Sequence, residues 1–127
     1  MSRRDKRISY FAYMRKSSES EDRQALSLES QKEELNKMIK ADNLQVIKEF
    51  EESHSAKVKG QRLFFNEMVR RIERGEANGI LLWHLNRLSR NAVDTGMVID
   101  LLDRGKLIEV KTPSQTFQNT PNDKFLL

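Results

Sequence analysis

The sequence has no cysteine, and its two histidines, His54 and His84, stand far apart. Without cysteine, the chain forms neither a disulfide nor a thiolate metal site. The histidines lack the short spacing of paired metal ligands, so no metal site is predicted. No uncharged apolar run approaches the roughly 18 residues of a membrane-spanning helix. Residues 1–7 are basic but no uncharged apolar signal core follows them, so we expect a cytoplasmic protein without a membrane partner.

Charged side chains are abundant in this chain. Charged residues make up 33% of its 127 residues and hydrophobic residues 37%. The length suits a single domain with a real core, spanning residues 1–127. The formal net charge is +4 and the sequence pI is about 9.5, a balance that is compatible with a polyanionic partner.

Hydrophobic periodicity predicts strands and helices in alternation. We expect strands at 8–15, 44–51, 79–85 and 107–110, and helices at 27–40, 62–74 and 92–104. Ser27 is the expected N-cap of the first helix, and Gly75 the stop of the second. From Thr112 onward the chain is predicted to be a loop, and residues 121–127 resemble the start of a helix. The alternation predicts an α/β fold, a three-layer sandwich around a mostly parallel sheet of four to five strands.

Basic residues and a serine follow three of these strands. Ser17 follows the first strand, Arg62 and the polar loop 53–61 follow the second, and Arg87 and Arg90 follow the third. Ligand sites in parallel sheets lie at the carboxyl ends of the strands, so the three segments are expected to meet at one edge. Arg87 and Arg90 lie about one helical turn apart, where both guanidiniums can reach the same phosphate.

Strand periodicity selects the nucleophile among the neighbouring serines. Tyr13, Arg15 and Ser17 share one face of an extended strand, whereas Ser18 points to the other. A serine among arginines, without metal ligands, indicates attack on a phosphodiester. Trp83 and His84, which end an apolar run, are expected to be core and structural residues rather than ligand contacts.

Five segments resemble one family. They are YMRKS at 13–17, SLESQ at 27–31, RLFFNEM at 62–68, NRLSRN at 86–91 and TPNDK at 120–124. Together they are similar to the N-terminal catalytic domain of serine site-specific recombinases, the resolvase/invertase superfamily. The long spacing between Ser17 and Gln31 resembles the large serine recombinases, which include phage integrases and transposon excision enzymes. On this resemblance, the chain ends at the start of the family's long C-terminal dimerisation helix.

The resemblance implies a defined chemistry without a metal or cofactor. Ser17 would attack the scissile phosphate of double-stranded DNA and form a 5′-phosphoserine link that is later religated. The non-bridging oxygens would be held by four guanidiniums, with a glutamine helping to position the site: Arg15, Arg62, Arg87, Arg90 and Gln31. The full-length protein would act as a dimer and a synaptic tetramer. Whether the reaction integrates, excises or inverts DNA stays open.

Asn86 departs from the family pattern, which has an aspartate before the first arginine of the Arg-x-x-Arg segment. Asparagine keeps the shape but cannot carry negative charge or transfer a proton. A second hypothesis is therefore a catalytically impaired relative that binds only DNA or partner subunits. A third is a flavodoxin-like nucleotide or response-regulator module. The chain has neither a glycine-rich phosphate loop nor an acidic phospho-acceptor cluster, and this argues against the third.

Overall fold

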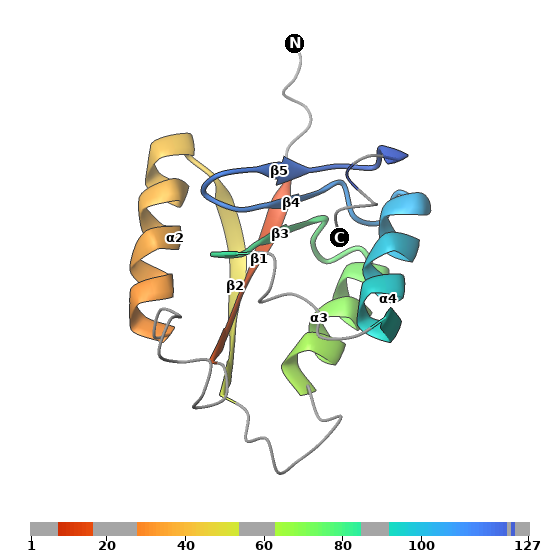
Figure 1. The fold of residues 1–127 in the computed structure, drawn as a ribbon, viewed down its shortest axis with the longest axis horizontal. Helices are drawn as coiled ribbons and strands as arrows, with labels where there is room; N and C mark the ends of the chain where they lie inside the picture. The colour runs from red at the N-terminus through yellow and green to blue at the C-terminus, as the bar shows by residue number, and fades with distance from the viewer. Residues whose placement is uncertain (1–7, 17–27, 54–62, 85–91, 122, 124–127) are drawn as a thin grey trace.

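The computed structural model describes residues 8–16, 28–53, 63–84, 92–121 and 123 of the chain (Figure 1). Strands and helices alternate along it, as predicted. The elements are β1 (Ser9–Lys16), α2 (Leu28–Asp42), β2 (Gln45–Ser53), α3 (Leu63–Glu73), β3 (Gly79–Leu81), α4 (Ala92–Asp103), β4 (Glu109–Lys111) and β5 (Thr116–Phe117). Most predicted boundaries differ from these by one or two residues. Gly75 adopts a positive φ of 87° just beyond α3 and so ends that helix as expected.

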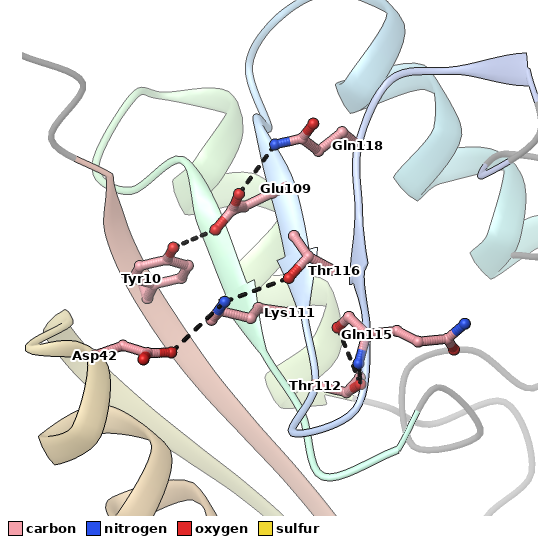
Figure 2. A network of polar contacts seen from close by, with 8 residues as sticks. All are labelled: Tyr10, Asp42, Glu109, Lys111, Thr112, Gln115, Thr116 and Gln118. Carbon is pink, nitrogen blue, oxygen red and sulfur yellow. Dashed lines mark hydrogen bonds and ion pairs between the residues drawn. The ribbon is translucent and has the colours of Figure 1, made fainter. Parts of the chain in front are cut away.

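The strands form one five-stranded sheet in the order β2-β1-β3-β4-β5. The first four are parallel, and β5 runs antiparallel to β4. The mostly parallel sheet of the prediction is thus confirmed. The predicted loop after Thr112 was wrong in part, because a tight turn brings β5 back beside β4. In that turn, the amide of Thr112 donates to the carbonyl of Gln115 (2.7 Å), and the Thr112 hydroxyl accepts from the Gln115 amide (3.0 Å; Figure 2).

Strand β3 is shorter than its apolar sequence predicts. The run from Gly79 was expected to stay extended to Leu85, but the strand ends at Leu81. The amide of Leu82 still donates to the carbonyl of Lys111 (3.0 Å), after which the chain bends. Leu82 remains fully buried. Hydrophobicity here reports burial rather than strand length, which explains the error.

Both faces of the sheet are covered, with α2 on one face and α3 and α4 on the other (Figure 1). Alternate residues of β1 enter the two cores, since successive strand side chains point to opposite faces. Phe11 and Tyr13 pack in the larger core, on the side of α3 and α4. Tyr10, Ala12 and Met14 pack in the smaller core beneath α2. This two-sided burial is typical of a central strand in a parallel sheet.

A buried carboxylate fixes the start of α3. Glu52, near the end of β2, is only 4% exposed. Its oxygens accept hydrogen bonds from the amides of Phe64 (3.0 Å) and Phe65 (3.2 Å) and from the hydroxyl of Tyr13. A negative charge at a helix N-terminus satisfies free amides and complements the helix dipole. One side chain thereby connects β1, β2 and α3.

A second polar network lies near the amino end of β1 (Figure 2). The hydroxyl of Tyr10 donates to Glu109 on β4, and Gln118 donates to the other oxygen of that carboxylate (3.2 Å). Burial and the hydrogen bond to Glu109 raise the pKa of Tyr10 well above its usual value. The backbone amide of Gln118 in turn donates to Asp123 (2.8 Å).

The chain leaves the sheet through a helix cap. Thr120 accepts a hydrogen bond from the amide of Asp123 (3.1 Å), the arrangement expected of an N-cap followed by proline. Pro121 and Asp123 have helical backbone, in agreement with the predicted helix start, and the rest of that segment lies outside the described residues. Among the helices of the described ranges, none has the length and apolar character needed to cross a membrane.

Gly79→Ala should destabilise the protein by about 1–3 kcal/mol, because overpacking forces the neighbours to shift. A Cβ at this position would stand 2.6 Å from the ring of Tyr10 and 2.7 Å from Ile8. Urea unfolding measures the effect. The matched control is Gly96→Ala within α4, where a Cβ meets nothing within 4 Å, and this change should stabilise by about 0.5–1 kcal/mol. Equal effects of the two changes would contradict the packing described.

Glu52→Gln should destabilise the protein by about 1–2 kcal/mol, since the neutral amide loses the charge-assisted bonds to the helix amides. Hydrogen exchange at the amides of Phe64 and Phe65 should accelerate. The control is Glu51→Gln on the same strand, whose exposed carboxylate pairs with Lys32 (3.6 Å). That surface pair is worth less than about 1 kcal/mol. A Glu51 variant as unstable as the Glu52 variant would refute the role of the buried carboxylate.

Candidate active site

The carboxyl ends of β1 and β2 meet at one edge of the sheet, at the lower end of the molecule in Figure 1. Helices α2 and α3 begin at the same edge, and Figure 1 shows their first turns there. Parallel strands impose this arrangement, because each returning helix carries the chain back to the opposite edge. We call this the catalytic edge, since it is where sequence analysis placed the candidate residues.

Arg15 lies at the catalytic edge with its side chain buried, at 3% exposure. It is next to last in β1 and is paired in register with Glu52 of β2. Alternation along the strand puts it on the same face as Tyr13, the α3 side, as predicted. A guanidinium remains protonated at any pH a protein tolerates, so burial concentrates a fixed positive charge at this point.

Gln31 lies in the first turn of α2 and is fully buried. Its side-chain amide nitrogen donates to the backbone carbonyl of Arg15 (3.1 Å). This bond joins the start of α2 to the end of β1, two residues before Ser17. Sequence analysis placed Arg15 and Gln31 in one site, and the structure brings these two together.

The remaining predicted site residues fall outside the described residues: Ser17, Arg62, Asn86, Arg87 and Arg90. The N-cap residue Ser27, the loop 17–26 and most of the loop 53–61 fall there too. Their described neighbours are placed. Lys16 ends β1, Leu63 begins α3 and Ala92 begins α4. Arg62 therefore directly precedes the helix start that Glu52 caps.

Sequence analysis missed Glu52 and the part played by the Tyr13 hydroxyl. A signal was available, because Phe50 is a buried core residue and Glu52 stands two positions later on the same strand face. An acidic residue at an inward position, just before a helix, is a candidate cap. The prediction ended the strand at residue 51 and began the polar loop at residue 53, so Glu52 was assigned to neither.

Trp83 is less buried than predicted. It is partly exposed and so is not a simple core residue, while the structural role expected of His84, which is exposed, stays a prediction. Their rings lie 5.7 Å apart between centroids, tilted by 45°. Both follow β3 and come just before the segment of the sequence that contains Arg87 and Arg90. In the part of the chain that the structure describes, no group of three or more metal-ligating side chains was found.

Solved structures of similar fold include recombinase domains. The N-terminal catalytic domain of TP901-1 integrase matches 93% of this chain and 87% of its own, at 19% identity and a TM-score of 0.70. A resolvase family site-specific recombinase from Streptococcus pneumoniae matches 84% and 72%, at 23% identity and a TM-score of 0.65. The C-terminal catalytic domain of ISC1926 TnpA, an IS607-like serine recombinase, matches 83% and 70%, at 19% identity and a TM-score of 0.63. At these identities the likeness establishes the fold.

Sequence comparison establishes the family. No curated protein matched the chain in a direct search. The family model described as "Resolvase, N terminal domain" matches residues 10–127, which include both Arg15 and Gln31 as well as every predicted site residue. The chain therefore belongs to the resolvase N-terminal domain family, the catalytic domain family of the serine recombinases.

Proposed function

We propose that this chain cleaves and rejoins DNA strands in site-specific recombination through a covalent phosphoserine intermediate. The observation that carries the proposal is the buried Arg15 at the end of β1, held through its carbonyl by Gln31. Family membership over residues 10–127 supports the same reaction. Double-stranded DNA is the proposed substrate, and the formal net charge of +4 suits a polyanion.

In the proposed first step, the Ser17 hydroxyl oxygen attacks the scissile phosphorus. A serine–phosphorus ester forms at the 5′ end of one strand, and the bond from phosphorus to the 3′ oxygen breaks. The proton lost by Ser17 is balanced by the proton gained by the leaving 3′ oxygen. A 3′ hydroxyl then attacks the phosphoserine and reverses these changes, so the phosphoester is conserved and no nucleotide cofactor is consumed.

The arginines would stabilise the charge that builds on the non-bridging oxygens. Arg15 suits this role, because a buried guanidinium acts in a lower dielectric than solvent and needs little reorganisation. Arg62, Arg87 and Arg90 are proposed to complete the set. Gln31 would act as a positioning residue, since its bond to the Arg15 carbonyl fixes the backbone that leads into Ser17.

The finer assignment is to the large serine recombinases. It rests on the long spacing from Ser17 to Gln31 and agrees with the fold likeness to TP901-1 integrase. We propose that the full-length protein works as a dimer and a synaptic tetramer. A second candidate function, binding of DNA or partner subunits without cleavage, is favoured by Asn86 alone.

Ser17→Ala should abolish covalent attachment to DNA while the fold persists. The protein is mixed with a pool of random-sequence duplexes, denatured and digested with nuclease and trypsin. Mass spectrometry then seeks a nucleotide adduct on the peptide that begins at Ser17. Ser18→Ala is the matched control and should keep the adduct. An adduct that survives in the Ser17 variant and disappears in the Ser18 variant would reverse the assignment. DNA binding without an adduct in any variant would favour the second candidate function.

Asn86→Asp should raise the rate of adduct formation by at least about tenfold, because a positioned acid or base accelerates proton transfer by about 10²–10⁴. The rate is followed by quenching the trapping reaction at intervals. Asn91→Asp provides a charge-matched control in the same segment and should not increase the rate. A rate unchanged by Asn86→Asp would show that the asparagine does not limit cleavage.

A further inference from the structure

Two aromatic residues at the catalytic edge have no part in the proposed phosphoryl transfer. Trp83 and His84 follow β3, and their rings lie 5.7 Å apart between centroids. The preceding residues Ile80, Leu81 and Leu82 are all fully buried, whereas Trp83 is partly exposed and His84 exposed. The apolar run thus reaches the surface at this point, and two aromatic side chains follow its buried part.

The position of the ring pair follows from the register of the sheet. Leu81 is paired with Ala12 of β1, and Leu82 makes one further bond to β4. Trp83 is the next residue, so it leaves the sheet at the carboxyl end of β3, the same edge of the sheet at which Arg15 lies in β1. The sequence from 83 to 93 contains Arg87 and Arg90 and no acidic residue. The rings therefore stand at the start of a locally cationic segment.

We propose that Trp83 and His84 form a platform that contacts the bases or sugars of DNA beside the scissile phosphate. This inference rests on the proposed function, because it requires DNA at the catalytic edge. An aromatic ring can pack against the sugars and the base-pair edges of a duplex, and an indole also offers one N–H donor to acceptors in the grooves. The platform would fix the position of the duplex along the catalytic edge, while the arginines hold the phosphate.

DNA fits this surface better than a protein partner does. A protein-binding patch at this place would be expected to continue in aliphatic side chains, whereas the aliphatic residues just before Trp83 are fully buried. The neighbouring sequence supplies guanidiniums, which suit phosphates. Binding of a partner subunit at this surface is the competing outcome of the test.

Trp83 is the only tryptophan in the chain, so its fluorescence reports on this site alone. The protein is titrated with a dye-labelled duplex at low salt, and dye anisotropy measures binding. In parallel, an unlabelled duplex of the same sequence is added while tryptophan emission and its quenching by acrylamide are recorded. We expect the emission to change with the same midpoint as the anisotropy, and acrylamide access to fall.

Substitutions separate the ring from the charges. Trp83→Ala should weaken duplex binding about tenfold, while Trp83→Phe, which keeps a ring, should retain most of the affinity. The slope of log affinity against log salt should stay the same in both variants, because neither removes a phosphate contact. Ile108→Ala, at a residue 40% exposed just before β4, is the matched control and should bind as the parent does. Circular dichroism and thermal melting establish that each variant is folded.

Each result decides between the alternatives. Normal duplex binding with unchanged tryptophan emission, together with full affinity in Trp83→Ala, would overturn the platform and leave the proposed function standing. An emission change that follows protein concentration instead of DNA would overturn it in favour of a subunit contact. A reduced salt slope in Trp83→Ala would show that the ring acts only by holding the arginines. Failure of the parent protein to bind duplex at low salt would overturn both the platform and the proposed function.

Discussion

The carboxylate of Glu52 is the contact on which the arrangement of the catalytic edge depends. It joins the hydroxyl of Tyr13 on β1 to the first amides of α3, and it does so from the end of β2. These hydrogen bonds add to the pairing of β1 with β2 and to the contact between the rings of Tyr13 and Phe65, and they fix the three elements relative to one another. A charge buried to this extent is tolerated because it is fully engaged by donors and by the helix dipole.

Two consequences follow for the proposed chemistry. The residue before α3 is Arg62, so the cap determines where the chain enters that helix just after a proposed phosphate ligand. Glu52 is also the register partner of Arg15. The same strand pair therefore carries a buried positive group and a buried negative group at adjacent positions. Gln31 adds a third fixed point by binding the Arg15 carbonyl from the opposite face of the sheet.

Much of this fold could be predicted because its signals are local. The alternation of core residues in β1, the helical spacing in α3 and the glycine stop at Gly75 each depend on a few neighbouring residues. The length of β3 and the presence of β5 could not be predicted so directly, since they depend on pairing with β4. Within the candidate site, family motifs predicted Arg15 and Gln31, and the structure brings these two residues together. Glu52 was missed because its role depends on α3, which lies beyond an intervening polar loop.

The same distinction applies to aromatic residues. Phe11, Tyr13 and Phe65 are all fully buried, at positions that strand alternation and helical spacing account for. Trp83 has a similar sequence context but follows the last bond of the β3–β4 ladder. Its exposure is decided by where the sheet stops, which is a tertiary property.

The polar network around Glu109 connects the last described helical turn to the central strand. Hydrogen bonds run from Tyr10 through Glu109 to Gln118 (Figure 2). The backbone amide of Gln118 then donates to Asp123, in the last described helical turn. Tyr10 lies near the amino end of β1, away from Arg15 at the other end of the same strand. The residues just after Thr120 are therefore connected by hydrogen bonds to the amino end of the central strand. Most of the length of β1 separates this connection from the catalytic edge.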